Sequence, residues 1–275
     1  MPEKNNQMNL PKRLYRYESF DTYSLSNLKA QSIYFTSPKH FNDPFDCSIT
    51  FDLSDLSERV FNKLYDFYLE AYPNKKQFIK RFGKSPSEKF KTYLIEALDD
   101  TLKKSKEKMI QERGISCYSE KNDDILMWSH YSDSHKGFCL EFDTSHDPFN
   151  MAIKVEYSSD FPKINPELFV IYDESKEIMK MFTIKFSCWE HEKEWRIFHN
   201  VAETLYGYPP EALTGIYFGA EMPKTHIEII ALVILGQNPN VKFYRAKKSR
   251  SKFAVSFEEF TYTSFIKAKQ MGLRE

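Results

Sequence analysis

Carboxylates and an arginine gather within ten residues of this chain, in the run WEHEKEWRIF from Trp189 to Phe198. If the run is an extended strand, side chains two residues apart share a face, so Glu192, Glu194 and Arg196 point the same way. A fixed carboxylate beside an arginine can bind or polarise a ligand, and it can equally form a surface salt bridge. His191 and Glu194 do not form HExxH, so the run does not indicate a metalloprotease.

The N-terminal run RLYRY holds a second candidate, Arg16. On a strand, Arg16 points away from Tyr15 and Tyr17. Its planar guanidinium suits an anion such as a pyrophosphate, which it can bind through two parallel hydrogen bonds. The spacing leaves open the alternative that Arg16 is a strand-end arginine paired with a surface carboxylate.

A third candidate is the run WSHYSDSHKG, which combines two aromatic rings with two histidines. Trp128 and Tyr131 can either stack on a planar ligand or fill the core. His130 and His135 lack a Cys or carboxylate at a known ligand spacing, so we predict no metal site. Gly137 comes directly before the strand-like FCLEF, where a glycine is typical of close approach by another backbone.

The run KFYRAKKSRSK near the C-terminus is strongly basic, with six Lys and Arg and two aromatics among eleven residues. This composition suits contact with nucleic acid, whose phosphates attract the cations and whose bases stack on the rings. The alternative is a solvated pair of strands. The cations are Lys242, Arg245, Lys247, Lys248, Arg250 and Lys252.

The chain as a whole has no net charge to steer it, because 39 basic residues balance 39 acidic ones among 275. Its longest apolar run, IIALVILG at 229–236, is far shorter than the ~20 residues of a membrane-spanning helix. The N-terminus lacks the apolar core of a secretory signal. The four cysteines form no CxxC pair, which favours free thiols in a reducing environment. We therefore expect a cytoplasmic protein with no membrane segment.

Familiar nucleotide-binding and acyl-transfer motifs are missing from the sequence. It contains no GxGxxG, no GxxxxGK[ST] and no GxSxG, and its 8 glycines leave few for loops that cradle phosphates. Cys47, Cys139 and Cys188 have no nearby acid–base pattern that would mark a nucleophile. We expect these cysteines to be buried as small hydrophobic side chains.

The elements that must position the candidates fall into three zones. Residues 12–52 predict a strand, a short helix and a strand, followed by the turn and extended run of FNDPFDCSITF. Residues 53–113 predict three or four helices, because apolar residues recur at helical spacing between breaks at Pro73, Gly83 and Pro86.

The third zone, from residue 115 to the C-terminus, is mostly short β runs. GISCYS, GFCLEFD, EWRIF, GIYFG and IIALVILG are all strand-like, and helices are predicted near 166–181 and 223–229. Together the zones predict one α+β domain spanning residues 1–275, with a largely antiparallel sheet. The helices of 53–113 are expected to be an insertion within it.

Four pieces of the chain resemble a bacterial family known as domain of unknown function 2971. The pieces are LYRY, SIYFTSPKHFNDPFDC, ISCYSEKNDDILMWSHYSDSHKGFCLEFD and EKEWRIF. They occur in the order found in the family and span roughly residues 14–198. The resemblance implies membership of this family, whose label carries no established chemistry.

LYRYESFDTYSLSNLKAQSIYFTSP also resembles the opening of ADP-ribosyltransferase-type domains of the DNA-modifying toxin branch, and EKEWRIF followed by GIYFG resembles their later strands. The resemblance implies a split sheet of that type and NAD as the substrate. It implies that Glu194 is the catalytic glutamate, with Glu192 as its competitor. It implies a binding site for NAD at Arg16, Tyr17, Thr36, Ser37, Trp128, Tyr131 and Arg196.

The function that this resemblance implies is NAD-dependent ADP-ribosyl transfer to a macromolecule, as a toxin or phage-defence effector. The acceptor, nucleic acid or protein, stays open. Arg16 replaces the His of the commoner triads, and no single tyrosine occupies the middle position. Two other classes remain: a binding module for nucleotides or nucleic acid, and a nuclease that uses Asp43, Asp46 and Glu194 with a divalent metal ion.

Overall fold

The computed structural model describes residues 10–51, 53, 56–164 and 175–273. In these residues the chain is a mixed α+β protein with a large, mostly antiparallel sheet, as predicted. It divides into two compact units. We call them the sheet unit (Met1–Ser37, Arg113–Val155 and Cys188–Glu275) and the helical unit (Pro38–Glu112 and Glu156–Ser187). A single domain spanning residues 1–275 stays a prediction.

Among the described residues, the sheet unit contains an eight-stranded sheet in the order β14-β13-β12-β5-β1-β4-β10-β6. All neighbours pair antiparallel except β12 and β13, which are parallel. A separate antiparallel pair joins β2 (Ser32–Phe35) to β11 (Thr204–Gly207). The strands of the large sheet are β1 (Arg13–Glu18), β4 (Gly114–Ser119), β5 (Phe138–Asp143), β6 (Ile153–Lys154), β10 (Glu194–His199), β12 (Leu213–Phe218), β13 (Lys242–Lys248) and β14 (Val255–Phe260).

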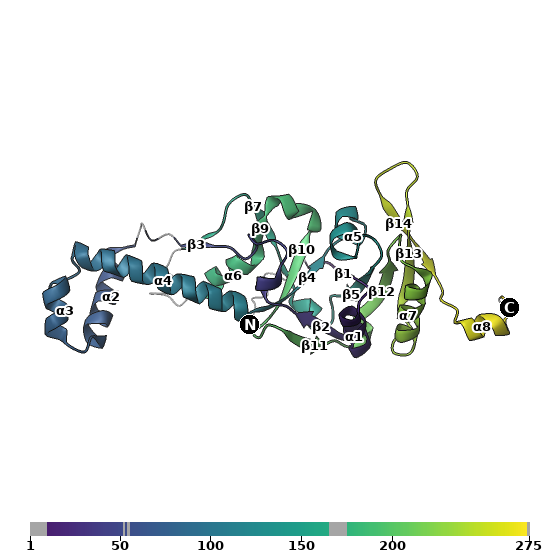
Figure 1. Cartoon of the computed structure of the whole chain (residues 1–275), viewed down its shortest axis with the longest axis horizontal. Helices are drawn as coiled ribbons and strands as arrows, with labels where there is room; N and C mark the ends of the chain where they lie inside the picture. Colours follow the sequence, from purple (N-terminus) through teal and green to yellow (C-terminus); the bar gives the residue numbers. More distant parts are fainter. Residues whose placement is uncertain (1–9, 52, 54–55, 165–174, 274–275) are drawn as a thin grey trace. The chain divides into compact units, whose positions relative to one another are not determined.

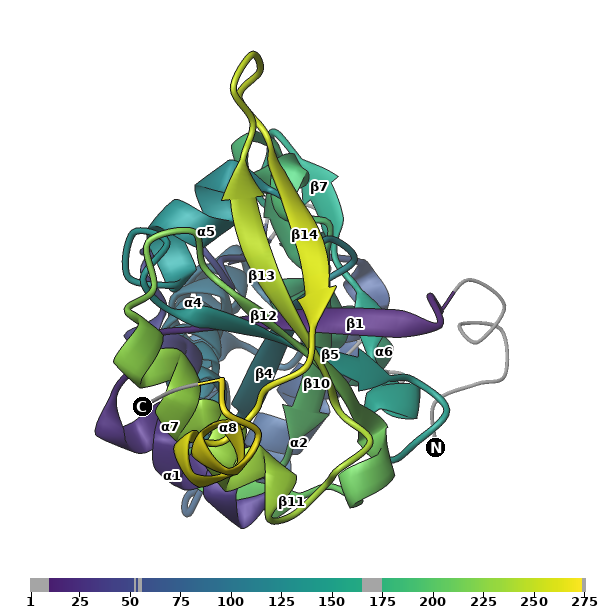
Figure 2. The same ribbon diagram turned by 90° about the vertical axis from the view of Figure 1, so that its right-hand side faces the viewer.

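Two helices of the sheet unit begin just after aspartates that cap them. The Asp21 carboxylate accepts the Ser24 N–H at 2.8 Å, and Asp124 accepts the Leu126 N–H at 2.9 Å, which satisfies donors that a first turn leaves unpaired. Helices α1 and α7 lie side by side, and α5 lies apart from them (Figure 1, Figure 2). The α-helices are α1 (Thr22–Ala30), α5 (Ile125–Tyr131), α7 (Lys224–Leu235) and α8 (Phe265–Gln270), and the 3-10 helices are η3 (Phe149–Met151), η5 (Ser187–Glu192) and η6 (Pro210–Ala212).

Helix α7 corrects one expectation. The run IIALVILG at 229–236 is not a strand, because its residues up to Leu235 belong to this helix. The buried side chains Ile227, Ile230, Ala231 and Ile234 follow the spacing of one helix face. Short apolar runs fit a strand and a buried helix equally well, and here the tertiary packing decides between them.

The strand register sorts side chains onto two faces of the large sheet. Directly opposite residues of an antiparallel pair share a face. Ser119 lies opposite Tyr15 on one side and opposite Glu194 on the other, so the three side chains lie on one face. We call it the Tyr15 face. Arg16 alternates with Tyr15 and therefore lies on the other face, which we call the Arg16 face. On that face it pairs with Leu140 of β5.

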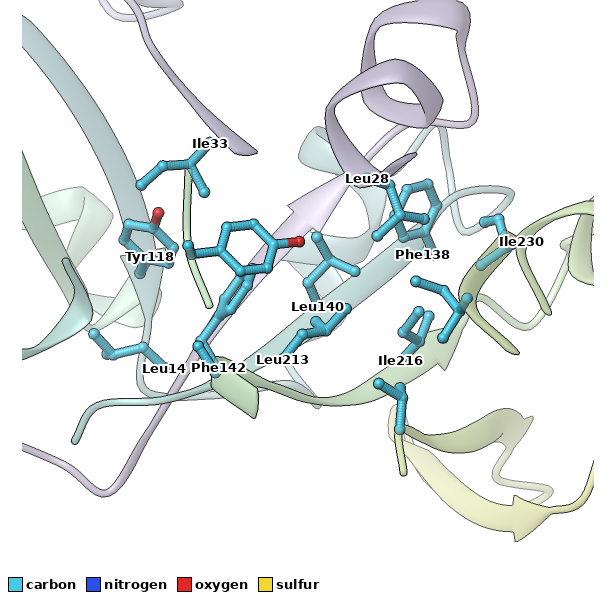
Figure 3. Packing of buried hydrophobic residues seen from close by; sticks show 14 of the residues in the cluster. Leu14, Leu28, Ile33, Tyr118, Phe138, Leu140, Phe142, Leu213, Ile216 and Ile230 are labelled. Carbon is cyan, nitrogen blue, oxygen red and sulfur yellow. The ribbon is translucent and has the colours of Figure 1, made fainter. Parts of the chain in front are cut away.

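Each face packs its own helices. On the Arg16 face, the main core joins the sheet to α1 and α7, and Figure 3 shows part of it. On the Tyr15 face, Trp128 of α5 packs with Tyr17, Cys139 and Tyr217. The labelled residues of Figure 3 are Leu14, Leu28, Ile33, Tyr118, Phe138, Leu140, Phe142, Leu213, Ile216 and Ile230.

The helical unit has its own core. Val60, Tyr65, Phe78, Phe90 and Leu94 are buried together, and several of their aromatic rings meet edge to face. The parallel pairs are β3 (Thr50–Phe51) with β8 (Lys163–Ile164), and β7 (Glu156–Ser158) with β9 (Ile184–Phe186). Its helices are η2 (Pro38–His40), α2 (Glu58–Ala71), α3 (Lys75–Phe82), α4 (Glu88–Glu112) and α6 (Ser175–Thr183).

Helices are therefore present where residues 53–113 predict them, as α2, α3 and α4. They are part of a larger unit that also contains η2 and the stretch 156–187. Of the helix predicted near 166–181, the first part lies outside the described residues, and α6 begins at Ser175.

Candidate functional site

A buried carboxylate and a buried arginine meet at the start of β10. Arg196 donates from Nε to Oε1 of Glu194 at 2.7 Å and from Nη2 to Oε2 at 3.1 Å, so the contact is bidentate. Glu194 is 4% exposed and Arg196 is 0% exposed. The two residues lie two apart on one strand, which puts both on the Tyr15 face, as the sequence predicts. The geometry holds the carboxylate in one orientation.

A second buried carboxylate, Glu192, lies just before this strand. Its Oε1 accepts the Tyr131 hydroxyl of α5 at 2.7 Å, and its carbonyl accepts the Ser119 hydroxyl of β4 at 2.5 Å. Lys193, which joins Glu192 to Glu194, has a φ of 46°, in the left-handed region. The turn between η5 and β10 is thus tied to both α5 and β4. We call Glu192, Glu194, Arg196 and Tyr131 the carboxylate site.

The carboxylate site can accept hydrogen bonds from hydroxyls and stabilise positive charge. Each carboxylate is already oriented, Glu194 by a guanidinium and Glu192 by a phenol. Groups fixed in advance need no reorganisation when charge develops in a reaction, which makes their stabilisation effective. Of the residues predicted to form the site, Arg196 contacts Glu194, and Tyr131 contacts Glu192, which precedes Glu194 by two residues in the chain.

Arg16 is not part of the carboxylate site, and its predicted part in binding NAD stays a prediction. It lies on the opposite face of the sheet from Glu194, where its Nε is 2.5 Å from Oε1 of Glu18 and it also donates to the Ser116 hydroxyl. Burial opposes the charged form, but Glu18 and Tyr118 raise the pKa of Arg16 above its usual value. The cavity beside it has a volume of about 10 Å³, which is room for one water molecule.

Two rings predicted to bind NAD, those of Trp128 and Tyr17, are buried in the core. Trp128 is 0% exposed, and its indole N–H donates to the Asn122 carbonyl at 2.7 Å. Tyr17 is 8% exposed, and its hydroxyl donates to the Lys121 carbonyl at 3.0 Å. The two rings meet edge to face with centroids 5.2 Å apart. Neither ring presents a face to a ligand.

Thr36 and Ser37 also lie away from Glu194. Thr36 pairs with Ile115 near the start of β4, whereas Glu194 pairs with Ser119 at its end. Four residues of strand separate the two positions, about 13 Å at ~3.3 Å per residue. The Ser37 N–H donates to Oε1 of Glu203 at 2.9 Å.

A polar cluster around Glu141, which the sequence does not predict, lies on the Tyr15 face. This carboxylate accepts the Thr214 hydroxyl at 2.7 Å and the Tyr217 hydroxyl at 2.7 Å, and Arg13 Nε lies 3.4 Å away. Burial and the Glu141 carboxylate raise the pKa of both Tyr15 and Tyr217. These residues meet because β1, β5 and β12 pair in the sheet, so no spacing in the sequence predicts the cluster.

The basic run forms β13 and the loop that joins it to β14, which extends away from the sheet (Figure 2). Three cations of the strand are paired: Lys242 with Glu259 at 3.2 Å, Lys247 with Glu258 at 2.5 Å, and Lys248 with Glu221. In the part of the chain that the structure describes, the loop cations Arg250 and Lys252 have no carboxylate partner. Phe253, beside them, is 99% exposed.

Three further observations concern metals, thiols and membranes. Within the described ranges, no group of three or more His, Cys, Asp or Glu is arranged to hold a metal ion. All four cysteines are free, and Cys47 and Cys139 are buried as expected, but Cys188 is exposed because it lies in η5 rather than in a strand. Of the helices that the structure describes, none has the length and apolar character needed to cross a membrane.

Comparison with known families finds one match. Residues 127–197 match the family described as "Protein of unknown function (DUF2971)". The matched stretch runs from α5 to β10, so it includes Tyr131, Glu192, Glu194 and Arg196, and it supports the first of the two resemblances seen in the sequence. No curated protein and no solved structure matches the chain significantly.

Proposed function

We propose that this protein is a NAD-dependent ADP-ribosyltransferase that uses the carboxylate site. The observation that supports it is the bidentate contact that fixes the buried Glu194 carboxylate against Arg196. The ADP-ribosyltransferase resemblance of the flanking sequence supplies the reaction class. The geometry supplies a carboxylate of the kind that the reaction needs.

In the proposed reaction the bond between nicotinamide and the ribose C1′ breaks, and nicotinamide leaves with the bonding electrons. The ribose then carries oxocarbenium-like positive charge, which the Glu194 carboxylate stabilises. An acceptor nucleophile forms the new bond at C1′ and releases its proton, which the Glu192 carboxylate can take. Arg196 acts as a positioning residue for Glu194. Arg16, Thr36 and Ser37 have no role in this version of the proposal.

Glu194→Gln is expected to lower nicotinamide release by about 100- to 1,000-fold, the range typical of removing one preorganised stabilising group. The assay follows nicotinamide release from NAD by the purified protein in a bacterial extract that contains both protein and nucleic acid. Glu190→Gln is the matched control, since Glu190 is a nearby exposed carboxylate that pairs only with Lys193 in the described contacts. If the folded wild-type protein releases no nicotinamide, the proposal fails and a binding module becomes the better explanation.

The proposed acceptor is nucleic acid, which the loop between β13 and β14 favours. It presents Arg250 and Lys252 to phosphates and the exposed ring of Phe253 to bases. A role as a toxin or phage-defence effector rests on the resemblance alone. It would appear as growth arrest on expression, relieved by Glu194→Gln.

The double variant Arg250→Ala/Lys252→Ala is expected to weaken binding to a labelled oligonucleotide and to make binding less dependent on salt. Each lost phosphate contact reduces the slope of log K against log salt by about 0.9 for duplex DNA and about 0.7 for single strands. Fluorescence anisotropy at salt concentrations between 50 and 200 mM measures the slope. Over this range the affinity of a protein with many phosphate contacts falls by about 10³-fold or more. Lys242→Ala/Lys247→Ala removes two paired cations and is the control; an equal change of slope in both variants would count against the loop.

A further inference from the structure

The helical unit contains a pocket of about 230 Å³ whose walls are aromatic. Phe45, Phe161 and Phe186 line it, and these rings are 63%, 46% and 50% exposed. Solvent-exposed apolar side chains that line one concave pocket are typical of a ligand-binding site. The pocket is separate from the residues of the carboxylate site, which all belong to the sheet unit.

Two of the rings lie nearly parallel at the pocket. The ring planes of Phe45 and Phe161 differ by 26°, and their centroids are 6.3 Å apart. A centroid distance includes any sideways offset between the rings, and two rings that sandwich a third need planes about 7 Å apart, since each stacked contact takes about 3.5 Å. A planar ligand therefore enters between them when one of these exposed rings rotates outward.

The backbone around the rings is well anchored. The Phe45 N–H donates to the Asp43 side chain at 2.8 Å, in the turn before the ring. Phe161 follows a turn in which the Ser158 hydroxyl accepts the Asp160 N–H at 3.0 Å. Phe186 lies on β9, where it pairs with Ser158 of β7. Rings on anchored backbone lose less conformational freedom when they bind a ligand.

The polar lining of the pocket carries charges of both signs. Lys185 lines it, with its ammonium 3.8 Å from Oδ2 of Asp46, and these side chains are only 5% and 3% exposed. Asp160 also lines it, and its Oδ2 accepts the Ser159 hydroxyl at 2.9 Å. Because Lys185 lies beside one carboxylate and a second carboxylate lines the pocket, the pocket does not favour an anionic ligand. Ser48 supplies a further hydroxyl for hydrogen bonds.

The size of the pocket limits the ligand. A volume of about 230 Å³ is below the ~300–1,000 Å³ of sites for drug-sized molecules, so it holds one ring system rather than a whole dinucleotide. Aromatic walls, neutral polar groups and this size suit a planar heteroaromatic ring. We propose that this pocket binds the base of a nucleoside by stacking it between Phe45 and Phe161. This site goes beyond the proposed transferase activity and does not depend on it.

Isothermal titration of the full-length protein with adenosine tests the proposal. Phe161→Ala and Phe45→Ala are each expected to weaken binding by about 5- to 150-fold, the effect of losing one stacked ring. Phe67→Ala is the control: this ring lies on α2 in the same unit, is 64% exposed and does not line the pocket, so adenosine affinity is expected to stay unchanged.

Phe161→Leu keeps most of the apolar volume and removes the flat ring, so it distinguishes stacking from general hydrophobic contact. Binding equal to wild type in Phe161→Leu would overturn stacking, and no saturable binding of adenosine by the wild type would overturn the site itself. Adenosine is also a part of NAD, so loss of adenosine binding in Phe161→Ala with normal nicotinamide release assigns adenosine to this pocket rather than to the transferase site. Adenosine binding by Glu194→Gln, with nicotinamide release lost, separates the two proposals.

Discussion

Arg196→Ala is expected to lower the free energy of unfolding by about 3–5 kcal/mol. The substitution removes the bidentate partner of Glu194, whose side chain is only 5% exposed, and leaves a cavity where a fully buried arginine stood. A buried carboxylate that loses its partner bears most of its desolvation penalty alone. Urea unfolding followed by circular dichroism at constant pH and salt measures the change.

Two controls separate loss of the pair from loss of volume. In Arg196→Met/Glu194→Met both charges are replaced by apolar side chains of similar length, and stability is expected to return toward wild type. Lys103→Ala breaks an exposed ion pair with Asp99 on α4 and is expected to change stability little. An Arg196→Ala protein that unfolds within 1 kcal/mol of wild type would show that the buried pair contributes no more than a surface pair.

Gly137→Ala is expected to destabilise the sheet unit by about 3 kcal/mol or more, at the upper end of overpacking effects. A Cβ on this residue would lie 2.1 Å from the Glu18 carbonyl oxygen and 3.1 Å from Ser132. Both neighbours are backbone atoms, so they cannot rotate away as a side chain would. The strands β1 and β5, which pair Glu18 with Phe138, would have to separate at this end.

The matched control for Gly137→Ala is Gly207→Ala in β11. A Cβ there has no neighbour nearer than the Gln31 carbonyl oxygen at 3.9 Å, an ordinary contact distance. Its stability is expected to stay within about 0.5 kcal/mol of wild type, as for most surface substitutions. Thermal unfolding of both variants measures the difference. Equal stability of the two would mean that β1 and β5 adapt to the extra methyl group at little cost.

Much of the local structure can be predicted from local sequence patterns. Alternating apolar residues and flanking turn residues located β4, β5, β10 and β12, and helical spacing located α2, α3 and α4. The close backbone approach predicted at Gly137 is confirmed, because a Cβ on this residue would lie 2.1 Å from the Glu18 carbonyl oxygen. The common face of Glu194 and Arg196 is also as predicted, since residues two apart on a strand always share one.

Which of these residues contact one another depends on the folded arrangement of the strands. Arg16 and Glu194 lie on strands that are both predicted, but a shift of one residue in register moves a side chain to the other face of a sheet. Glu192 accepts a hydrogen bond from the Tyr131 hydroxyl, and Glu141 accepts one from the Tyr217 hydroxyl. The two residues of each pair are more than 60 positions apart in the sequence. Strand order and register come from long-range packing, which no local spacing encodes. The elements are therefore local properties of this sequence, while the carboxylate site is a property of the fold.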